Sequence, residues 1–325
     1  MTAGYSAAHA GAAFMQRSDR VRMEFSGAKP VETLNGIFTN DVSLLRPGSG
    51  LYAAALTNKG KVVADVRVFA REDRFVVDTS AAAGPAFISM IRKYVNPRLA
   101  TYRDVTAALG TVGVFGPTAA RAVTSAVDLP AESLASVPLY GQIALPSGGG
   151  FIARVPDLGV VGFDIFLPTD ALGTVVSRLR AAGLDELSPA DAEILRVEAG
   201  RPLYGADMDE NVLAQEAALD REDLAAISFN KGCYTGQETV ARVHFRGHVN
   251  RTLRGLRADS VLMSGASLHA TDGTQVGEVR SVAQSPRLGT IALAFVRREV
   301  ADGSQLNART PHGESPVTVT PLPFR

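Results

Sequence analysis

The chain has 325 residues and a mass of 34.2 kDa, with 46% hydrophobic and 20% charged residues. These values are typical of a soluble globular protein with two or three domains, and they exclude a disordered chain, a collagen-like fibre and a coiled coil. The 33 Lys and Arg residues balance the 33 Asp and Glu residues, so no net charge favours nucleic acid or a membrane surface.

The N-terminal end is rich in alanine but has neither the basic start nor the long apolar run of a secretory signal peptide. No later stretch reaches the ~18–20 consecutive apolar residues that a membrane-spanning helix needs. We therefore expect a cytoplasmic protein without a membrane contact, in which residues 1–19 form a loose leader. A strand over 21–25 and a helix over 30–38 are expected to follow.

Two segments of the chain share one pattern of strand, turn, strand and helix. Strands over 61–70 and from Phe75 precede a helix over 85–94, and strands over 151–155 and 160–167 precede a helix over 170–181. An accidental match is one explanation, because this order of elements is common. The alternative is a duplication that gives two related α+β halves, which meet across a cleft suited to a ligand.

The pattern of apolar and turn residues changes near Leu253. Short segments with alternating apolar residues follow, separated by turn signals, and the strand candidates lie at 275–281, 290–296 and 317–320. This pattern predicts a small C-terminal β-barrel or sandwich. We place the domain boundary after residue 245, with the barrel at 246–325 and two α+β subdomains within 1–245. Their own boundary is expected near 110–150, and the two subdomains can be interleaved.

Asp65 lies in a strand whose neighbouring residues are apolar. A lone carboxylate in such a strand is costly unless it faces a cleft or has a partner. In a cleft, loss of solvent would raise its pKa and suit it to proton transfer or to binding a nitrogen heterocycle. The alternative is an ion pair with Arg67 or Arg196. Asp78 ends the next strand and is expected to open onto the same cleft.

The most unusual local sequence is Phe229–Glu238, which holds the only cysteine, Cys233. Thr235 and Glu238 fit a capping box, so we predict a helix that begins at Thr235. A helix start and the nearby Lys231 would both stabilise a thiolate at Cys233. The alternative is a small buried residue in a crowded turn. One cysteine excludes an intramolecular disulfide and any metal or iron–sulfur site built from several cysteines of this chain.

Charge is balanced overall but not locally. Twelve acidic residues lie between Asp185 and Asp223, whereas no acid and five arginines lie between Glu238 and Asp259. An arginine cluster suits a polycarboxylate or phosphate ligand, because guanidinium groups pair with such groups through two hydrogen bonds. The alternative is a solvated face paired with the acidic segment. Sparse aromatic residues make direct nucleic-acid binding unexpected, and the histidine spacing predicts no metal site.

The residues Lys231–Glu238 resemble the signature of the YgfZ-type folate-binding proteins, which are similar to the aminomethyltransferase, or T-protein, of the glycine cleavage system. Further blocks carry the same resemblance, at 34–42, 60–69, 195–205 and 275–296. The resemblance spans about residues 20–300. It implies a three-part α+β fold, with two α+β domains around a central channel and a C-terminal β-barrel.

The resemblance also implies tetrahydrofolate as the cofactor and a role in assembly or repair of iron–sulfur enzymes, with effects on tRNA modification. The cluster would belong to client iron–sulfur proteins, which agrees with a single cysteine. We expect a monomer. The rival function is a tetrahydrofolate-dependent aminomethyltransferase or demethylase, and a third is a scaffold that has lost folate binding.

The resemblance assigns roles to individual residues. Cys233 and Lys231 are the expected catalytic residues; the expected folate contacts are Asp65, Asp78, Asp164, Arg196, Glu198 and Tyr204. This sequence departs from the T-protein pattern at Ala64, where the pattern has an acidic partner of Asp65. If the chain is an aminomethyltransferase, an acid restored at this position should improve the transfer. The chain has no tryptophan, although tryptophans line the folate cleft in some YgfZ-type members.

Overall fold

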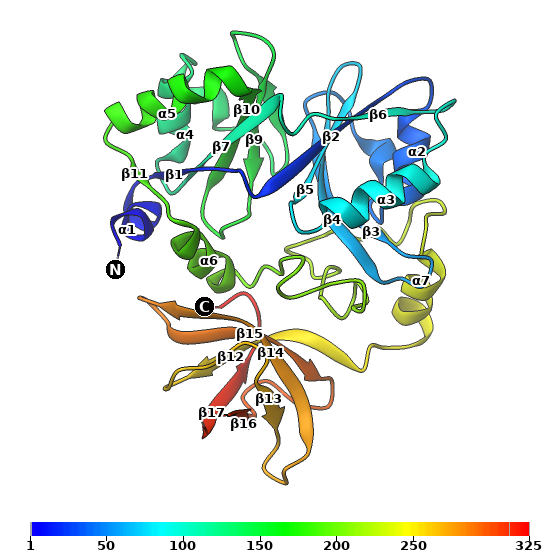
Figure 1. The fold of residues 1–325 in the computed structure, drawn as a ribbon, viewed down its shortest axis with the longest axis vertical. Helices are drawn as coiled ribbons and strands as arrows, with labels where there is room; N and C mark the ends of the chain where they lie inside the picture. The colour runs from blue at the N-terminus through cyan, green and yellow to red at the C-terminus, as the bar shows by residue number, and fades with distance from the viewer. Residues whose placement is uncertain (1, 312, 325) are drawn as a thin grey trace.

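The computed structural model describes residues 2–311 and 313–324 and has the expected three parts. Two units, each a sheet with helices, stand side by side, and a barrel closes the assembly below them (Figure 1). The three-part α+β fold predicted from the sequence is therefore confirmed. Within the described residues, no helix is long and apolar enough to cross a membrane.

The first unit is a five-stranded sheet with the order β3-β4-β5-β2-β6. Its elements are β2 (Arg20–Ser26), α2 (Pro30–Ile37), η1 (Val42–Leu44), β3 (Gly50–Leu56), β4 (Val62–Ala70), β5 (Phe75–Ser80), α3 (Gly84–Tyr94) and β6 (Thr101–Asp104). Leu34 of α2, Phe38 directly after it and Phe87 of α3 pack against the sheet, and all three side chains are fully buried. β4 is buried along its whole length, because one face meets these helices and the other faces the second unit.

The second unit is a six-stranded sheet with the order β11-β1-β7-β10-β9-β8. Its elements are α1 (Ala3–Ala10), β1 (Ala13–Gln16), β7 (Leu109–Phe115), α4 (Ala119–Ala126), η2 (Ala131–Leu134), β8 (Gln142–Ala144), β9 (Phe151–Val155), β10 (Gly162–Pro168), η3 (Thr169–Ala171), α5 (Leu172–Ala181) and β11 (Asp185–Glu186). The run β3-β4-β5-β2 in the first sheet matches β8-β9-β10-β7 in the second. This shared order agrees with the duplication that the sequence pattern suggests.

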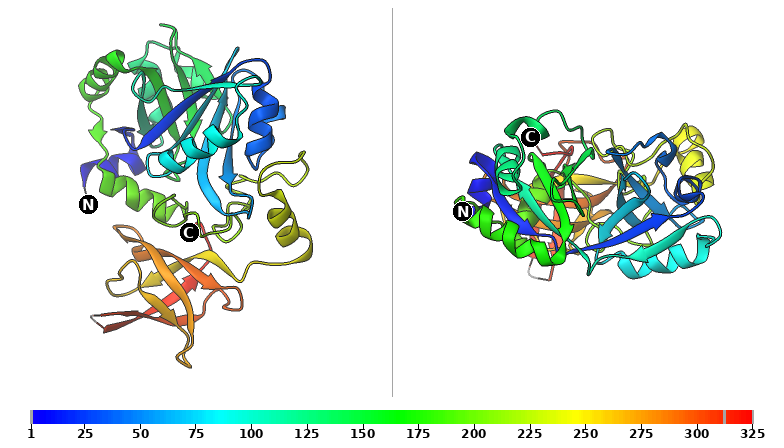
Figure 2. Two further views of the ribbon diagram at one scale, coloured as in Figure 1. Left: turned by 45° about the vertical axis from the view of Figure 1, so that its right-hand side comes forward. Right: turned by 90° about the horizontal axis from the view of Figure 1, so that it is seen from above.

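The N-terminal segment corrects one prediction. Residues 1–19 were expected to form a loose leader, but β1 is a strand of the second sheet and α1 packs beside β1 and β11. Tyr5 and Phe14 are buried, and their burial provides the free energy that orders this end of the chain. β1 therefore belongs to the second unit and β2 to the first, so the chain passes between the two units at residues 17–19 (Figure 2).

Aromatic side chains join the two units. Phe151 and Phe166 stack with ring centroids 4.4 Å apart, and Phe69 of β4 meets both rings at 5.5 and 5.4 Å. These contacts combine large apolar burial with favourable ring geometry. They fix the distance between the two sheets and so define the space between them.

The third part is a closed barrel with the order β12-β15-β14-β13-β16-β17. Its strands are β12 (Arg251–Ala258), β13 (Ser267–His269), β14 (Gln275–Ser285), β15 (Gly289–Arg297), β16 (Gln305–Thr310) and β17 (Gly313–Thr320). The strands predicted at 275–281, 290–296 and 317–320 lie within three of them. Alternate side chains, including Leu256 and Val279, fill the interior, as expected for a barrel of this size.

Two helices connect these parts. α6 (Pro189–Glu198) has Pro189 in its first turn and a capping box between Ser188 and Asp191, which together fix where it begins. α7 (Gln237–Arg246) begins two residues later than predicted, and Thr235 does not cap it. Gly236 occupies the capping position at φ +87°, where a Cβ would lie 2.5 Å from the Thr57 carbonyl oxygen, so only glycine fits.

Candidate functional site

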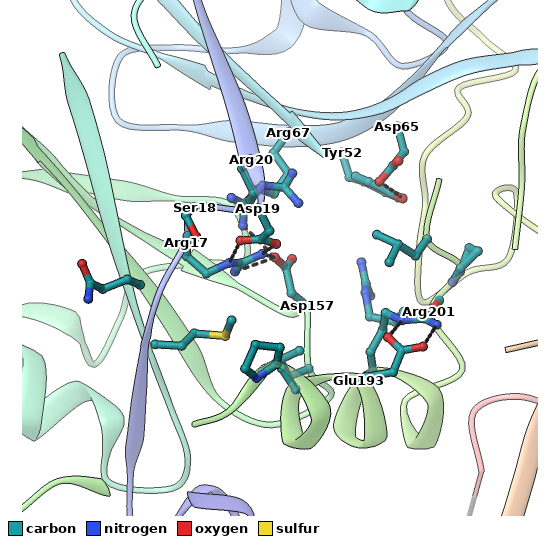
Figure 3. A pocket seen from close by; sticks show the side chains of 18 residues that line it. Arg17, Ser18, Asp19, Arg20, Tyr52, Asp65, Arg67, Asp157, Glu193 and Arg201 are labelled. Atoms are coloured by element: carbon teal, nitrogen blue, oxygen red, sulfur yellow. Dashed lines mark hydrogen bonds and ion pairs between the residues drawn. The ribbon is translucent and has the colours of Figure 1, made fainter. Parts of the chain in front are cut away.

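A cavity of about 320 Å³ lies where the two units meet α6 (Figure 3). Four regions line it: the segment that crosses between the units, strands β3 and β4, the turn after β9, and α6 with the residues that follow it. This volume lies at the lower end of the range for small-molecule sites. The expected hollow between the duplicated halves is therefore present.

Asp65 supplies the most unusual group in this cavity. Its Oδ2 accepts a hydrogen bond from the Tyr52 hydroxyl at 3.1 Å, whereas its Oδ1 is buried and has no partner among the described residues. Burial raises the pKa of Asp65, although Arg20 and the Tyr52 hydrogen bond oppose this shift. A buried carboxylate oxygen without a donor is costly, so Asp65 is suited to accept an N–H from a bound molecule.

Tyr52 orients this carboxylate. Its ring stacks on Tyr140 with centroids 6.1 Å apart, and the Arg201 guanidinium lies 5.7 Å from the Tyr52 centroid. Burial, and then the Asp65 charge, raise the pKa of Tyr52 well above its usual range. Tyr52 therefore keeps its proton and acts as the donor to Asp65.

A buried ionic cluster supports the cavity wall. The Arg67 guanidinium lies 2.7 Å from Asp78 Oδ1 and 2.8 Å from both Asp164 Oδ2 and Asp157 Oδ2. Burial alone would raise the pKa of Asp157, but Arg67 and Arg17 outweigh it and hold the pKa far below its usual range. The cluster spans both units, since Arg67 and Asp78 belong to the first and Asp164 belongs to the second.

Asp78 and Asp164 are placed differently from the prediction. Both are fully buried and neither lines the cavity. Asp78 accepts hydrogen bonds from Arg20 and Arg67, and Asp164 pairs with Arg67 and Arg17. The two carboxylates position arginines, and Arg17, Arg20 and Arg67 line the cavity in their place. Direct contact of Asp78 and Asp164 with a folate stays a prediction that this placement does not favour.

Ala64 also differs from the expectation. Successive residues of a strand point to opposite faces, so Ala64 faces away from Asp65. It is fully buried within the hydrophobic core that contains Leu34 and Phe87. An acid at this position would therefore lie in the apolar core and would not join Asp65 in the cavity.

Arg196 lines the cavity as predicted, but its donors are occupied. Nε donates to Glu193 at 2.8 Å, Nη1 donates to Asp207 at 2.7 Å, and Nη2 donates to the Ser281 hydroxyl in the barrel at 2.7 Å. It does not pair with Asp65. Arg196 therefore joins α6 to the barrel. Arg201, in the same wall of the cavity, is better placed to give a ligand a cationic contact.

Glu198 and Tyr204 lie outside the central cavity. Glu198 accepts hydrogen bonds from Tyr5 and Ser285 and lines a neighbouring cavity of about 580 Å³. The Tyr204 hydroxyl donates to Glu210 at 3.2 Å. The structure therefore brings Asp65 and Arg196 together and separates these two residues from them.

Cys233 is exposed and lines none of the cavities described here. The alternative prediction, that Cys233 is a small buried residue in a crowded turn, is therefore wrong. The Lys231 ammonium donates to the carbonyl oxygens of Asn35, Phe38 and Asn40 at 2.6, 2.6 and 2.9 Å. Burial lowers the pKa of Lys231 to about 8. Its observed contacts tie the cysteine loop to residues 35–40, and the catalytic roles of both residues stay predictions.

The arginines between Glu238 and Asp259 do not form a ligand cavity at the centre of the molecule. Arg251 pairs with Glu216 of the acidic segment at 3.1 Å, and Arg254 pairs with Asp302. Arg242 and Arg246 lie on the exposed face of α7. Pairing with the acidic segment, which the sequence left as an alternative, accounts for Arg251.

Several lining residues escaped the sequence analysis. Arg17 and Asp19 lie where a loose leader was expected, and Arg20 directly follows it. Arg201 lies within the 195–205 block but was given no role there, and Tyr52 lies outside every block that was singled out. A usable signal existed for the first group. Three charged residues lie within four positions directly before the predicted strand over 21–25, and such a cluster indicates a polar surface where that strand begins.

Replacing Asp65 by asparagine is expected to stabilise the empty protein at pH 7. The folded-state pKa is raised, so the folded state disfavours the ionised carboxylate, and this cost sets in as pH rises above the ordinary value of 3.8. The gain in melting temperature should fade as pH falls below that value. Thermal unfolding of both proteins from pH 3 to pH 7 measures it, and identical curves at every pH would contradict the account.

Comparison with known proteins gives a consistent result. The family model described as the GCVT N-terminal domain matches residues 1–225. The family model described as the glycine cleavage T-protein C-terminal barrel domain matches residues 251–325. A protein named aminomethyltransferase from Ralstonia nicotianae is 31% identical, over 93% of this chain and 83% of that protein. A protein of the same name from Rubrobacter xylanophilus is 29% identical, over 92% of this chain and 79% of that protein.

A solved structure shows the same fold. The glycine cleavage system aminomethyltransferase T from Bartonella henselae superposes with a TM-score of 0.89 and 22% identity. The superposition covers 99% of this chain and 88% of that one. The likeness therefore extends over both units and the barrel.

Proposed function

Because the chain belongs to the glycine cleavage T-protein family, we propose that it is a tetrahydrofolate-dependent one-carbon transferase, an aminomethyltransferase or a related demethylase. One observation carries this proposal. The cavity between the duplicated units contains a buried carboxylate oxygen, Asp65 Oδ1, that has no donor within the described part of the chain.

The residues in the cavity suit a folate. A pterin ring offers N–H groups to a carboxylate, and Asp65 supplies one without a competing donor. The p-aminobenzoyl-glutamate part of the molecule carries aromatic and carboxylate groups. Tyr52 offers a ring face, and Arg201 in the same wall offers a guanidinium group that pairs well with a carboxylate.

Tetrahydrofolate, when bound, supplies the secondary amine that receives the one-carbon unit. Asp65 Oδ1, when ionised, would accept a hydrogen bond from that molecule and would then take up a proton during the transfer, for which the raised pKa of Asp65 suits it. Tyr52 holds the carboxylate in place through Oδ2. The aromatic contacts of Phe69 and the ionic cluster behind Arg67 keep the wall rigid, which positions these groups for transfer.

The test is an assay with an S-aminomethyl thiol donor and tetrahydrofolate, with ammonia release as the readout. The proposal predicts release that requires both tetrahydrofolate and the protein. A parallel reaction with an N-methyl amine donor, followed by the formation of 5-methyltetrahydrofolate and the free amine, separates an aminomethyltransferase from a demethylase. Purified, folded protein that binds tetrahydrofolate but releases no one-carbon unit from either donor would contradict the transferase function.

A second function rests on Cys233. The resemblance of Lys231–Glu238 to the YgfZ-type proteins suggests an accessory protein for iron–sulfur enzymes, with effects on tRNA modification. The exposure of Cys233 outside the cavities favours this function, because an exposed thiol can meet a client protein directly. Cys233→Ser should then abolish recovery of client activity in depleted cells but leave tetrahydrofolate binding intact. Full recovery by the variant would rule out a thiol mechanism.

A further inference from the structure

A further cavity, of about 260 Å³, borders the segment that crosses between the two units. It shares Gln16, Arg17, Ser18 and Arg20 with the central cavity. The rest of its wall comes from Arg22 and from the 106–111 and 169–172 segments, none of which lines the central cavity. The crossing segment therefore separates the two, and we call the smaller one the outer cavity.

The wall of the outer cavity is cationic. Arg17, Arg20 and Arg22 line it, and no Asp or Glu does so. The carboxylates that pair with these arginines are Asp19, Asp78, Asp157 and Asp164. These acids lie outside the wall, and Arg17 and Arg20 donate hydrogen bonds to them. Arg22 Nη2 donates to the Arg17 carbonyl oxygen. The polar residues that line the outer cavity are therefore arginines, threonines, a serine and a glutamine, without a carboxylate.

Two polar atoms of this wall are buried without a hydrogen-bond partner among the described residues: Arg22 Nε and Thr111 Oγ1. Both side chains are only 3% exposed. The nearest charge to Arg22 Nε is Asp78 Oδ2 at 3.7 Å, which is beyond hydrogen-bond distance. Burial lowers the pKa of Arg22 because the attraction of Asp78 does not outweigh it. Buried polar groups normally have partners, so these two atoms indicate a missing one.

We propose that the outer cavity binds a compact oxyanion, a phosphate or carboxylate group on a small molecule. Guanidinium groups bind such oxygens through paired, charge-assisted hydrogen bonds, and a hydroxyl adds one more donor. The Thr111 hydroxyl has that donor free. The Thr169 hydroxyl does not, since it donates to the Ala107 carbonyl at 2.8 Å. The outer cavity shares Arg17 and Arg20 with the central one, but Arg22 and Thr111 line the outer cavity alone, so the proposal does not rest on the one-carbon chemistry.

Calorimetric titration with inorganic phosphate tests the proposal on the whole chain. The wild-type protein should bind phosphate saturably, and Thr111→Val should weaken binding by about tenfold, since it removes a hydrogen bond to a charged group. Thr111 lies in a strand, where valine is well tolerated, so the variant should fold. Thr169→Val is the matched control and should leave the phosphate affinity unchanged.

Two further arms identify the source of the oxyanion. Glycerol phosphate represents a phosphate ester, and glutarate represents a dicarboxylate. The compound that binds more tightly identifies the chemical class of the natural ligand. Absence of saturable binding in all three arms would overturn the proposal. Equal phosphate affinity of Thr111→Val and the wild type would overturn it as well. A loss of phosphate and tetrahydrofolate binding together in Thr111→Val would contradict a separate site.

Discussion

Asp65→Ala is expected to lower tetrahydrofolate-dependent one-carbon transfer by about 10²–10⁴-fold, the usual contribution of a positioned acid or base. The variant removes the one buried carboxylate oxygen of the cavity that has no donor in the described structure. It also frees the Tyr52 hydroxyl, which then has no acceptor in the wall. Initial rates of ammonia release with saturating donor measure the effect.

A matched variant separates this effect from a general loss of charge. Asp73 lies in the exposed turn between β4 and β5, on the same hairpin as Asp65. Asp73→Ala should transfer the one-carbon unit at the wild-type rate. Asp65→Asn keeps the shape of the side chain, so a large loss in this variant assigns the effect to proton acceptance. Wild-type rates in both Asp65 variants would remove Asp65 from the chemistry.

Arg67→Met is expected to destabilise the fold by about 3–5 kcal/mol, because it leaves buried carboxylates without their cation. Arg67 is 1% exposed, and Asp78 and Asp164 are fully buried on either side of it. Asp157 also loses the charge that lowers its pKa most. The free energy of unfolding in urea, measured near pH 7, gives the cost.

The control for Arg67 is a surface arginine with a similar contact distance. Arg309 pairs with Glu314 at 2.7 Å, but both side chains are largely exposed. Arg309→Met should change the free energy of unfolding by less than about 1 kcal/mol, since exposed pairs contribute little. If the two substitutions cost the same, the ionic cluster does not hold the two units together.

Much of the fold could be predicted because its elements carry local patterns. The repeated order of strands and helix predicts the two α+β units, since short apolar runs bounded by turn residues mark their strands. The barrel strands follow from alternation and turn residues in the same way. These signals lie within a few residues of each other and need no knowledge of distant contacts.

The site was predicted less completely, because partners distant in the chain decide it. Asp65 could be recognised as a site residue from its apolar neighbours in the strand alone. The free-energy cost of burying a carboxylate among such neighbours can be judged from the local sequence. Asp78 has the same local signature, yet Arg20 and Arg67 neutralise it, and only the fold brings them together. Lys231 likewise looked like a neighbour of Cys233, but its ammonium contacts residues 35–40, far away in sequence.

The central claim is that the cavity between the duplicated units binds tetrahydrofolate through Asp65. Titration calorimetry of the wild type, Asp65→Ala and Asp73→Ala with tetrahydrofolate tests it most directly. We predict saturable binding to the wild type and to Asp73→Ala, and a clear loss of affinity in Asp65→Ala. No heat with the folded wild-type protein, or equal affinity in all three, would contradict the claim and favour a scaffold that has lost its ligand.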